Sequence, residues 1–128
     1  MIVGLGMDVV EIARIARILA GPAGRAERFL ARCFTEGERA YCEGAHDRAA
    51  RYAARFAAKE AASKALGAPP GIAWHDVEVR RTGGGPALDL RGVAREAAAR
   101  LGADRVLVSL THDAGVAAAT VILEGGSP

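Results

Sequence analysis

The chain has 128 residues, a length that fits one domain with a single core. Half of the residues are hydrophobic but only 5% are aromatic, so Ala, Val, Leu and Ile must build that core. The formal net charge of +2 excludes the strong basic bias of a nucleic-acid-binding protein, although positive charge can still gather locally.

Residues 2–10 form the first predicted element, a buried strand rich in Val, Ile, Leu and Met. No basic segment precedes it, it contains Asp8, and it is far shorter than the roughly 20 residues that span a bilayer. The spacing of Cys33 and Cys42 matches neither a CxxC motif nor a disulfide framework, so we expect both thiols to be reduced. These features predict a cytoplasmic protein without a membrane segment.

Four helices are predicted in the first half of the chain, over residues 12–19, 25–33, 35–43 and 47–66. The first has apolar residues at helical spacing and stops at Gly21-Pro22. A capping box of Thr35 and Glu38 opens the third. The fourth is the longest, is rich in residues of high helix propensity, and is closed by Gly67.

The second half of the chain predicts a helix over residues 93–101 and strands over 74–81, 88–90, 105–111 and 116–123. Alternation places Val77 and Val79 on one face of the first of these strands, and the glycine-rich turn at 83–86 reverses the chain. The order of elements predicts an α+β fold, with an antiparallel sheet packed against one long helix and several short helices. We expect one domain over residues 1–124 and a frayed tail over 125–128.

The two lysines of the chain stand out against its fifteen arginines, because Lys59 and Lys64 both lie close to Glu60 on the long predicted helix. A lysine kept in an arginine-rich chain favours a compact point charge, such as one placed against a phosphate. A basic stripe at helical spacing runs beside them, formed by Arg48, Arg51, Arg55 and Lys59. Cations around one carboxylate suit a polyphosphate with bound Mg²⁺. A solvated helix face with an ordinary Glu60–Lys64 pair is the alternative.

Asp8 lies in the apolar run GLGMDVV, where a carboxylate is costly to bury unless it is paired, hydrogen-bonded or bound to a metal. The alternative is that Asp8 caps the helix that follows. The Gly4-x-Gly6 start lacks the third glycine of the dinucleotide-binding fingerprint, so we exclude a Rossmann fold.

The segment SLTHD, residues 109–113, brings polar residues to the end of an apolar strand. His112 is a candidate general base or phosphate ligand, and Asp113 is a candidate to orient it or to activate a nucleophile. A hydrogen-bonded connection between two strands is the alternative for this turn.

Together, three segments resemble the holo-acyl-carrier-protein synthase family of 4′-phosphopantetheinyl transferases: GLGMDVVE at residues 4–11, RFAAKEAASKALG at 55–67 and SLTHD at 109–113. The likeness covers nearly the whole chain and implies the phosphopantetheinyl transferase fold. It also implies that Asp8 and Glu60 hold Mg²⁺, that coenzyme A is the donor, and that the protein is a homotrimer with sites at subunit interfaces.

The reaction that the resemblance implies begins with a serine hydroxyl of apo acyl carrier protein, which attacks the β-phosphorus of coenzyme A and releases adenosine 3′,5′-bisphosphate. Arg55, Lys64 and His112 are then candidates for the phosphates of coenzyme A, including its 3′-phosphate, and Lys59 is an expected coenzyme A contact beside them. Three candidates remain for the base that takes the serine proton. They are a metal-associated water oriented by Glu60, the side chain of Asp113 and the side chain of His112. The carrier would serve fatty-acid or polyketide synthesis.

A basic patch on the early helices is expected to dock the acidic carrier, through Arg14, Arg17, Arg25 and Arg28. Each of these arginines is also compatible with an ordinary solvated helix face.

One departure from the family concerns the turn at residues 83–86, where many members carry a basic residue at the position of Gly85. The backbone of this turn can still approach coenzyme A, so Gly84 and Pro86 are expected contacts.

Two other classes of protein compete with this hypothesis. A non-catalytic α+β module that docks an acidic protein would show no metal dependence. A nucleotide-hydrolysing enzyme would use the same Mg²⁺ and lysine, but the chain has no GxxxxGK[ST] loop to hold a triphosphate.

Overall fold

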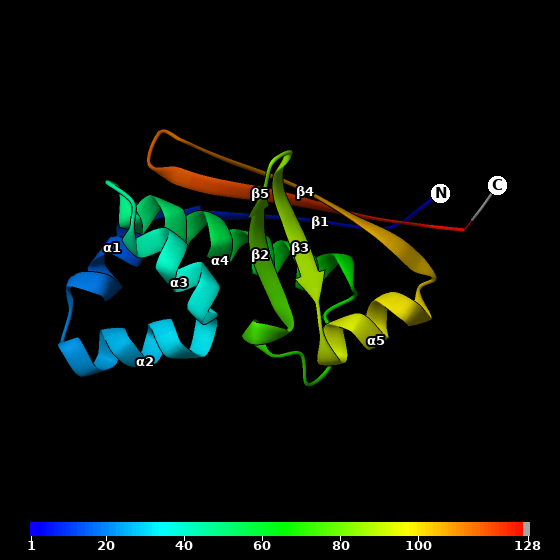
Figure 1. The fold of residues 1–128 in the computed structure, drawn as a ribbon, viewed down its shortest axis with the longest axis horizontal. Coiled ribbons are helices and arrows are strands. Elements are labelled where there is room, and N and C mark those ends of the chain that lie inside the picture. Colours follow the sequence, from blue (N-terminus) through cyan, green and yellow to red (C-terminus); the bar gives the residue numbers. More distant parts are fainter. Residues whose placement is uncertain (127–128) are drawn as a thin grey trace.

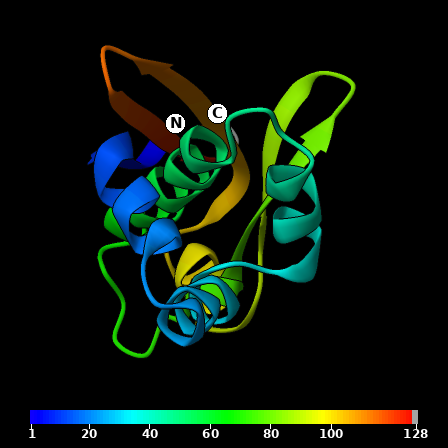
Figure 2. The same cartoon turned by 90° about the vertical axis from the view of Figure 1, so that its left-hand side faces the viewer.

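Helix α4 (Arg48–Ala65) lies at the centre of the computed structural model, which describes residues 1–126 (Figure 1). A three-stranded antiparallel sheet lies on one side of it, in the order β1 (Ile2–Glu11), β5 (Val116–Gly125) and β4 (Ala103–Asp113). A separate antiparallel hairpin is formed by β2 (Val77–Thr82) and β3 (Gly85–Leu90), and Figure 2 shows α4 between the sheet and this hairpin. The predicted α+β fold with antiparallel strands is confirmed.

The remaining helices surround α4 and match the predicted positions: α1 (Ile12–Ala20), α2 (Ala23–Cys33), α3 (Glu36–Glu43) and α5 (Gly92–Arg100). The predicted capping box of Thr35 and Glu38 is present at the start of α3. None of the helices in residues 1–126 is both long and apolar enough to cross a membrane.

Two segments differ from the expected strands and tail. Trp74–Asp76 forms a 3-10 turn before β2, because Asp76 accepts a hydrogen bond from the backbone of Ala73 and holds the turn closed. Gly125 is not frayed: it ends β5, and its N–H donates to the carbonyl of Met1 at 2.9 Å. The rest of the expected tail includes residues 127–128, which lie outside the described part of the chain.

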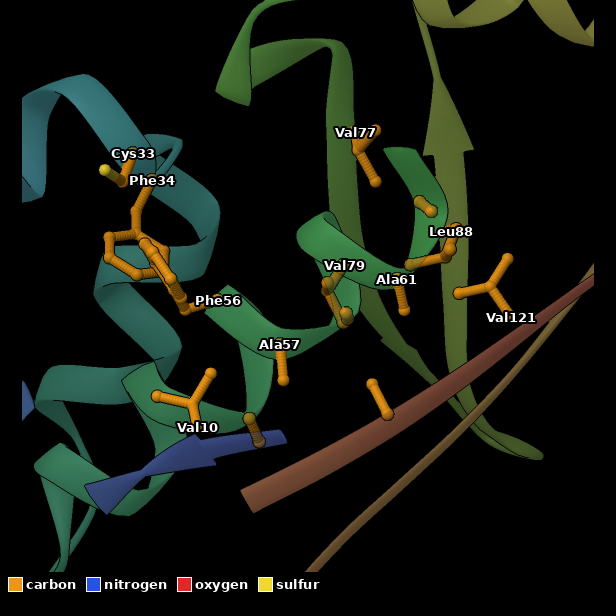
Figure 3. Packing of buried hydrophobic residues seen from close by; sticks show 14 of the residues in the cluster. Val10, Cys33, Phe34, Phe56, Ala57, Ala61, Val77, Val79, Leu88 and Val121 are labelled. Atoms are coloured by element: carbon orange, nitrogen blue, oxygen red, sulfur yellow. The ribbon is translucent and has the colours of Figure 1, made fainter. Parts of the chain in front are cut away.

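The contact between α4 and β1 is unusually close because two glycines of β1 face the helix. A Cβ on Gly6 would lie 2.0 Å from the carbonyl oxygen of Ala61, and one on Gly4 would lie 2.4 Å from that of Ala65. Figure 3 shows Ala57 and Ala61 of α4 packed in the core on this side of the helix. Small residues on both partners therefore let the helix backbone rest on the strand.

The outward face of β1 is not buried by this chain, so the expectation of a buried strand is wrong for half of its residues. Ile2, Leu5, Met7 and Val9 keep about 60% of their surface exposed. The reason is that the helices of residues 1–126 cover only the other face of the sheet (Figure 1). An apolar run without alternation is typical of a strand covered on both faces, whereas β1 is covered on only one face within residues 1–126.

We expect Gly6→Ala to lower the free energy of unfolding by about 1–3 kcal/mol or more, because the added methyl group forces α4 away from β1. Urea denaturation of the wild type and the variant measures this difference. Gly83→Ala is the matched control, since a Cβ there meets nothing within 4 Å. Unchanged stability of Gly6→Ala would contradict the close helix–strand contact.

Candidate active site

Asp8 is brought to α4 by the same alternation that points Gly4 and Gly6 at the helix. The Nζ of Lys64 donates to Oδ1 of Asp8 at 3.1 Å and to the carbonyl of Met7 at 3.0 Å. The side chain of Asp8 is only 17% exposed, whereas that of Lys64 is 54% exposed and keeps one N–H for another partner. We call Asp8, Glu60 and Lys64 the acidic flank of α4.

Glu60 belongs to this flank through its charge interactions. Burial and the nearby carboxylate of Asp8 raise the pKa of Glu60 above its usual range, and Lys64 and Arg14 oppose that rise. Two carboxylates that share one half-buried place repel each other unless a cation lies with them. The acidic flank therefore attracts positive charge beyond that of Lys64.

The donor set of the acidic flank fits Mg²⁺. This ion prefers oxygen ligands and often takes only one or two protein carboxylates, completing its shell with water and substrate phosphates. Within residues 1–126 no group of three or more His, Cys, Asp or Glu residues is arranged to enclose a metal. Asp8 and Glu60 thus suit an open metal site that a phosphate ligand completes.

Lys59 is buried, so it cannot bind a phosphate from solvent as predicted. Its ammonium forms a buried ion pair with Glu38 at 2.8 Å, with the two side chains 1% and 0% exposed, and also donates to the carbonyls of Trp74 and Val77. These three acceptors use all three N–H groups of the ammonium. Burial lowers the pKa of Lys59, and the charge of Glu38 opposes that change. Lys59 is therefore a structural cation, which we remove from the set of coenzyme A contacts.

A cavity of about 170 Å³ opens beside Glu60, and its lining includes residues that the sequence analysis did not single out. Among them are Ser63, Ile72 and Trp74. The Trp74 ring stacks on Phe56, with centroids 4.7 Å apart, and its carbonyl accepts from Lys59. One sequence feature could have indicated this wall of the cavity: Trp74 is the only tryptophan of the chain and follows a Pro-Pro-Gly turn.

Arg55 and His112 come together on the opposite side of α4. They line a depression of about 300 Å³ with Arg51, Arg81 and Tyr41. Arg55 lies five residues before Glu60, which is roughly 140° around a helix, and His112 is on β4, at the other edge of the sheet from Asp8. The predicted grouping of His112 with Asp8 and Glu60 is thus not formed within one chain. We call Arg51, Arg55, Arg81 and His112 the arginine flank.

Asp113 does not orient His112 in this structure. Its Oδ1 accepts a hydrogen bond from the N–H of Ala114 at 2.9 Å and holds the turn between β4 and β5. Successive side chains of a strand point to opposite faces, so His112 and Asp113 diverge. Asp113 therefore belongs to a hydrogen-bonded connection between two strands, which was the alternative to a catalytic role.

The charges of the arginine flank are unbalanced. No carboxylate forms an ion pair with Arg51, Arg55 or Arg81 in the described part of the chain, whereas such pairs are made by Arg39, Arg48, Arg80, Arg91 and Arg105. Arg55 is only 4% exposed, and its buried Nε has no hydrogen-bond partner within residues 1–126. Burial lowers the pKa of Arg55, and the charge of Arg81 acts in the same direction. Such a cluster suits an anionic ligand.

The turn that contains Gly84 and Pro86 lies at the tip of the β2–β3 hairpin. Pro86 pairs with Arg81 across the hairpin, and Arg81 lines the depression of the arginine flank. These two expected contacts therefore lie near the arginine flank, on a hairpin that α4 separates from the sheet containing β1 (Figure 2).

The four arginines of the expected docking patch line two adjoining depressions that share Arg25. Arg14 and Arg17 line the first, and Arg28 lines the second together with the rings of Phe29 and Trp74. The guanidinium of Arg14 also lies 6.0 Å from the centre of the Phe56 ring. Arg14 is also one of the positive charges that act on Glu60, so this end of the patch lies toward the acidic flank.

Comparison with known proteins places the chain in one family. The profile of the 4′-phosphopantetheinyl transferase superfamily matches residues 4–120, which include Asp8, Glu60 and His112. The holo-[acyl-carrier-protein] synthase of Anaeromyxobacter sp. (strain Fw109-5) is 74% identical over 125 residues, covering 98% of this chain and 97% of that protein. That of Myxococcus xanthus (strain DK1622) is 60% identical over 121 residues, covering 94% of each.

Solved structures agree with these sequence matches. Helicobacter pylori holo-[acyl-carrier-protein] synthase in complex with coenzyme A has a TM-score of 0.78 at 29% identity, covering 94% of this chain and 99% of that one. The Bacillus anthracis enzyme in complex with CoA (3′,5′-ADP) has a TM-score of 0.77 at 34% identity, covering 98% and 99%. The chain belongs to the 4′-phosphopantetheinyl transferase superfamily, and within it to the holo-[acyl-carrier-protein] synthases, which are enzymes.

Two substitutions should move the pKa of Glu60 in opposite directions. Asp8→Asn removes a negative charge that raises this pKa, so the pKa should fall, while burial keeps it above the usual value. Lys64→Met removes a positive charge that lowers it, so the pKa should rise further. Carboxyl-carbon NMR titration of the metal-free protein measures both shifts.

Arg17→Met is the control, because Arg17 is not among the charges that act on Glu60. A shift of the same sign in Asp8→Asn and Lys64→Met would contradict the electrostatic account of the acidic flank.

Proposed function

We propose that the protein transfers the 4′-phosphopantetheine group of coenzyme A to a serine of an apo acyl carrier protein, in a reaction that depends on Mg²⁺. The observation that supports this proposal most strongly is the acidic flank, where Asp8 and Glu60 share one half-buried place with an exposed lysine. Membership of the holo-[acyl-carrier-protein] synthases supports the same reaction.

Each residue of the acidic flank has a distinct part in this proposal. Asp8 and Glu60 would hold Mg²⁺, which when bound supplies positive charge against a pyrophosphate. Lys64 keeps one N–H free and can donate it to a phosphate oxygen while its other two hold Asp8 and Met7. The main work of this flank is to orient the pyrophosphate and to balance its charge.

The chemical step exchanges one phosphorus–oxygen bond for another. The serine Oγ of the carrier bonds to the β-phosphorus of coenzyme A, and the bond from that phosphorus to the bridging oxygen breaks. Adenosine 3′,5′-bisphosphate leaves with the bridging oxygen. The serine proton passes to a base of the site, and a water oriented by Glu60 is the candidate that lies beside Asp8 within one chain.

We further propose that the active protein is a homotrimer in which the acidic flank of one protomer meets the arginine flank of the next. Two features of the single chain support this arrangement. Its two flanks lie on opposite sides of α4, and the outward face of β1 leaves four apolar side chains about 60% exposed. A heterologous contact that closes into a ring pairs different faces of neighbouring copies and so can unite the two flanks.

The docking patch would receive the acidic carrier protein. Arg14 is one of the charges that act on Glu60 and lines the same depression as Arg17, so a carrier bound there would hold its serine near the pyrophosphate. Charge complementarity of this kind speeds encounter and sets orientation more than it adds affinity.

The proposal predicts that the wild-type protein, coenzyme A and Mg²⁺ convert apo acyl carrier protein into the phosphopantetheinylated form, seen by mass spectrometry. Carriers from fatty-acid and polyketide synthesis are compared in the same assay. Asp8→Ala and Glu60→Ala should each lower kcat/KM by about a hundredfold or more, because each removes a metal ligand that acts on the transferring phosphate.

Asp104→Asn is the control, since Asp104 is an exposed carboxylate in a different depression, beside α5. No transfer to any carrier would contradict the proposal. Binding of the carrier without transfer and without metal dependence would favour the non-catalytic docking module instead.

A further inference from the structure

Tyr41 stands at the centre of the arginine flank, although neither the resemblance nor the reaction assigns it a role. The guanidinium carbons of Arg51 and Arg55 both lie 4.2 Å from the centre of its ring, and that of Arg81 lies 5.7 Å away. Arg51 also donates to the carbonyl of Tyr41 at 3.0 Å. One residue on α3 thus contacts cations from both α4 and the β2–β3 hairpin.

We propose that Tyr41 is a positioning residue for the phosphate monoester of coenzyme A, and that it sets the preference of the enzyme for coenzyme A over 3′-dephospho-coenzyme A. Its ring holds the three guanidiniums in place for that phosphate. This inference rests on the proposed function, and on the assignment of Arg55 and His112 to the phosphates of coenzyme A.

The cluster needs such a holder because its charges repel one another. Arg51, Arg55 and Arg81 have no carboxylate partner within residues 1–126, and the depression they line contains no acidic residue among those described. The face of an aromatic ring attracts guanidinium groups without carrying a net charge. A carboxylate in the place of Tyr41 would also hold the arginines, but it would neutralise them and repel an incoming phosphate. An aromatic ring preserves the positive field that the ligand requires.

The kind of phosphate follows from the chemistry of the two flanks. Coenzyme A carries a pyrophosphate and one phosphate monoester, and the pyrophosphate is the group that suits a metal held by two carboxylates. The monoester is close to a dianion at neutral pH and has three terminal oxygens. Three unpaired guanidiniums beside His112 offer more charge and more N–H donors than a singly charged group can use.

The test compares Tyr41→Leu with Tyr41→Phe, because phenylalanine keeps the ring and leucine removes it. Tyr41→Leu should raise the KM for coenzyme A about fivefold to thirtyfold while kcat stays unchanged. Its KM for 3′-dephospho-coenzyme A should hardly change, so the preference between the two donors falls by the same factor. Tyr41→Phe should keep the preference of the wild type.

A series of fluorinated phenylalanines at position 41 keeps the fold testable if Tyr41→Leu does not fold. Each added fluorine weakens the attraction of the ring for cations at nearly constant shape, so log KM for coenzyme A should rise with each one. Arg39→Gln is the control: it removes a cation from the same helix that is paired with Glu27, and it should leave the donor preference unchanged.

The outcomes separate this inference from the proposed function. Absence of transfer by the wild type would overturn the proposed function. Transfer by the wild type with an unchanged donor preference in Tyr41→Leu, or a flat response to fluorination, would overturn the role of Tyr41 alone. Direct titration with adenosine 3′,5′-bisphosphate should rank the variants as the KM for coenzyme A does. Titration with adenosine 5′-monophosphate, which lacks the 3′-phosphate, should rank them as the KM for 3′-dephospho-coenzyme A does.

Discussion

Helix α4 can rest directly on β1 because Gly4 and Gly6 present no side chains to it. The backbone of Ala61 lies where a Cβ on Gly6 would be, so any larger residue would move the helix and with it Glu60 and Lys64. The next residue of β1 on the same face is Asp8, which therefore meets the exposed end of this contact. The glycines that allow the packing and the aspartate that forms the site are parts of one alternating pattern, so fold and site depend on the same close approach.

A single helix serves two groups of opposite charge character on its two sides. The acidic flank gathers carboxylates whose repulsion favours a cation, and the arginine flank gathers guanidiniums whose repulsion favours an anion. Between them the buried pair of Lys59 and Glu38 ties α4 to α3 and to the backbone of residues 74–79. A buried ion pair with all its hydrogen bonds satisfied adds little net stability but strongly penalises other arrangements of these segments. It thus keeps the wall of the cavity beside Glu60 in place.

Sequence patterns predicted most of this architecture because local rules decide it. Helical periodicity located α4, and the Thr35–Glu38 capping box located α3. The resemblance of three segments to a known family singled out Asp8 and Glu60 as metal ligands. The failures share a physical cause, which is that a spacing along the helix does not say what packs against each face. Lys59 and Lys64 looked equivalent beside Glu60, yet one is buried against Glu38, which had been noted only as a cap. The grouping of Tyr41 with Arg81 depends on how α3 meets the hairpin, which no local pattern encodes.

The central claim is that the acidic flank of one protomer works with the arginine flank of another. Mixing two variants, Asp8→Ala and Arg55→Ala, tests it most directly once their subunits have exchanged, at a coenzyme A concentration far below the KM of Arg55→Ala, where neither variant alone is active. The claim predicts recovery of about a quarter of wild-type activity, because a quarter of the shared sites in randomly mixed trimers combine an intact Asp8 with an intact Arg55 from a neighbour. Wild type mixed with the double variant checks that exchange occurs. A mixture no more active than its two components would contradict the claim. It would mean that the two flanks do not combine between neighbouring protomers.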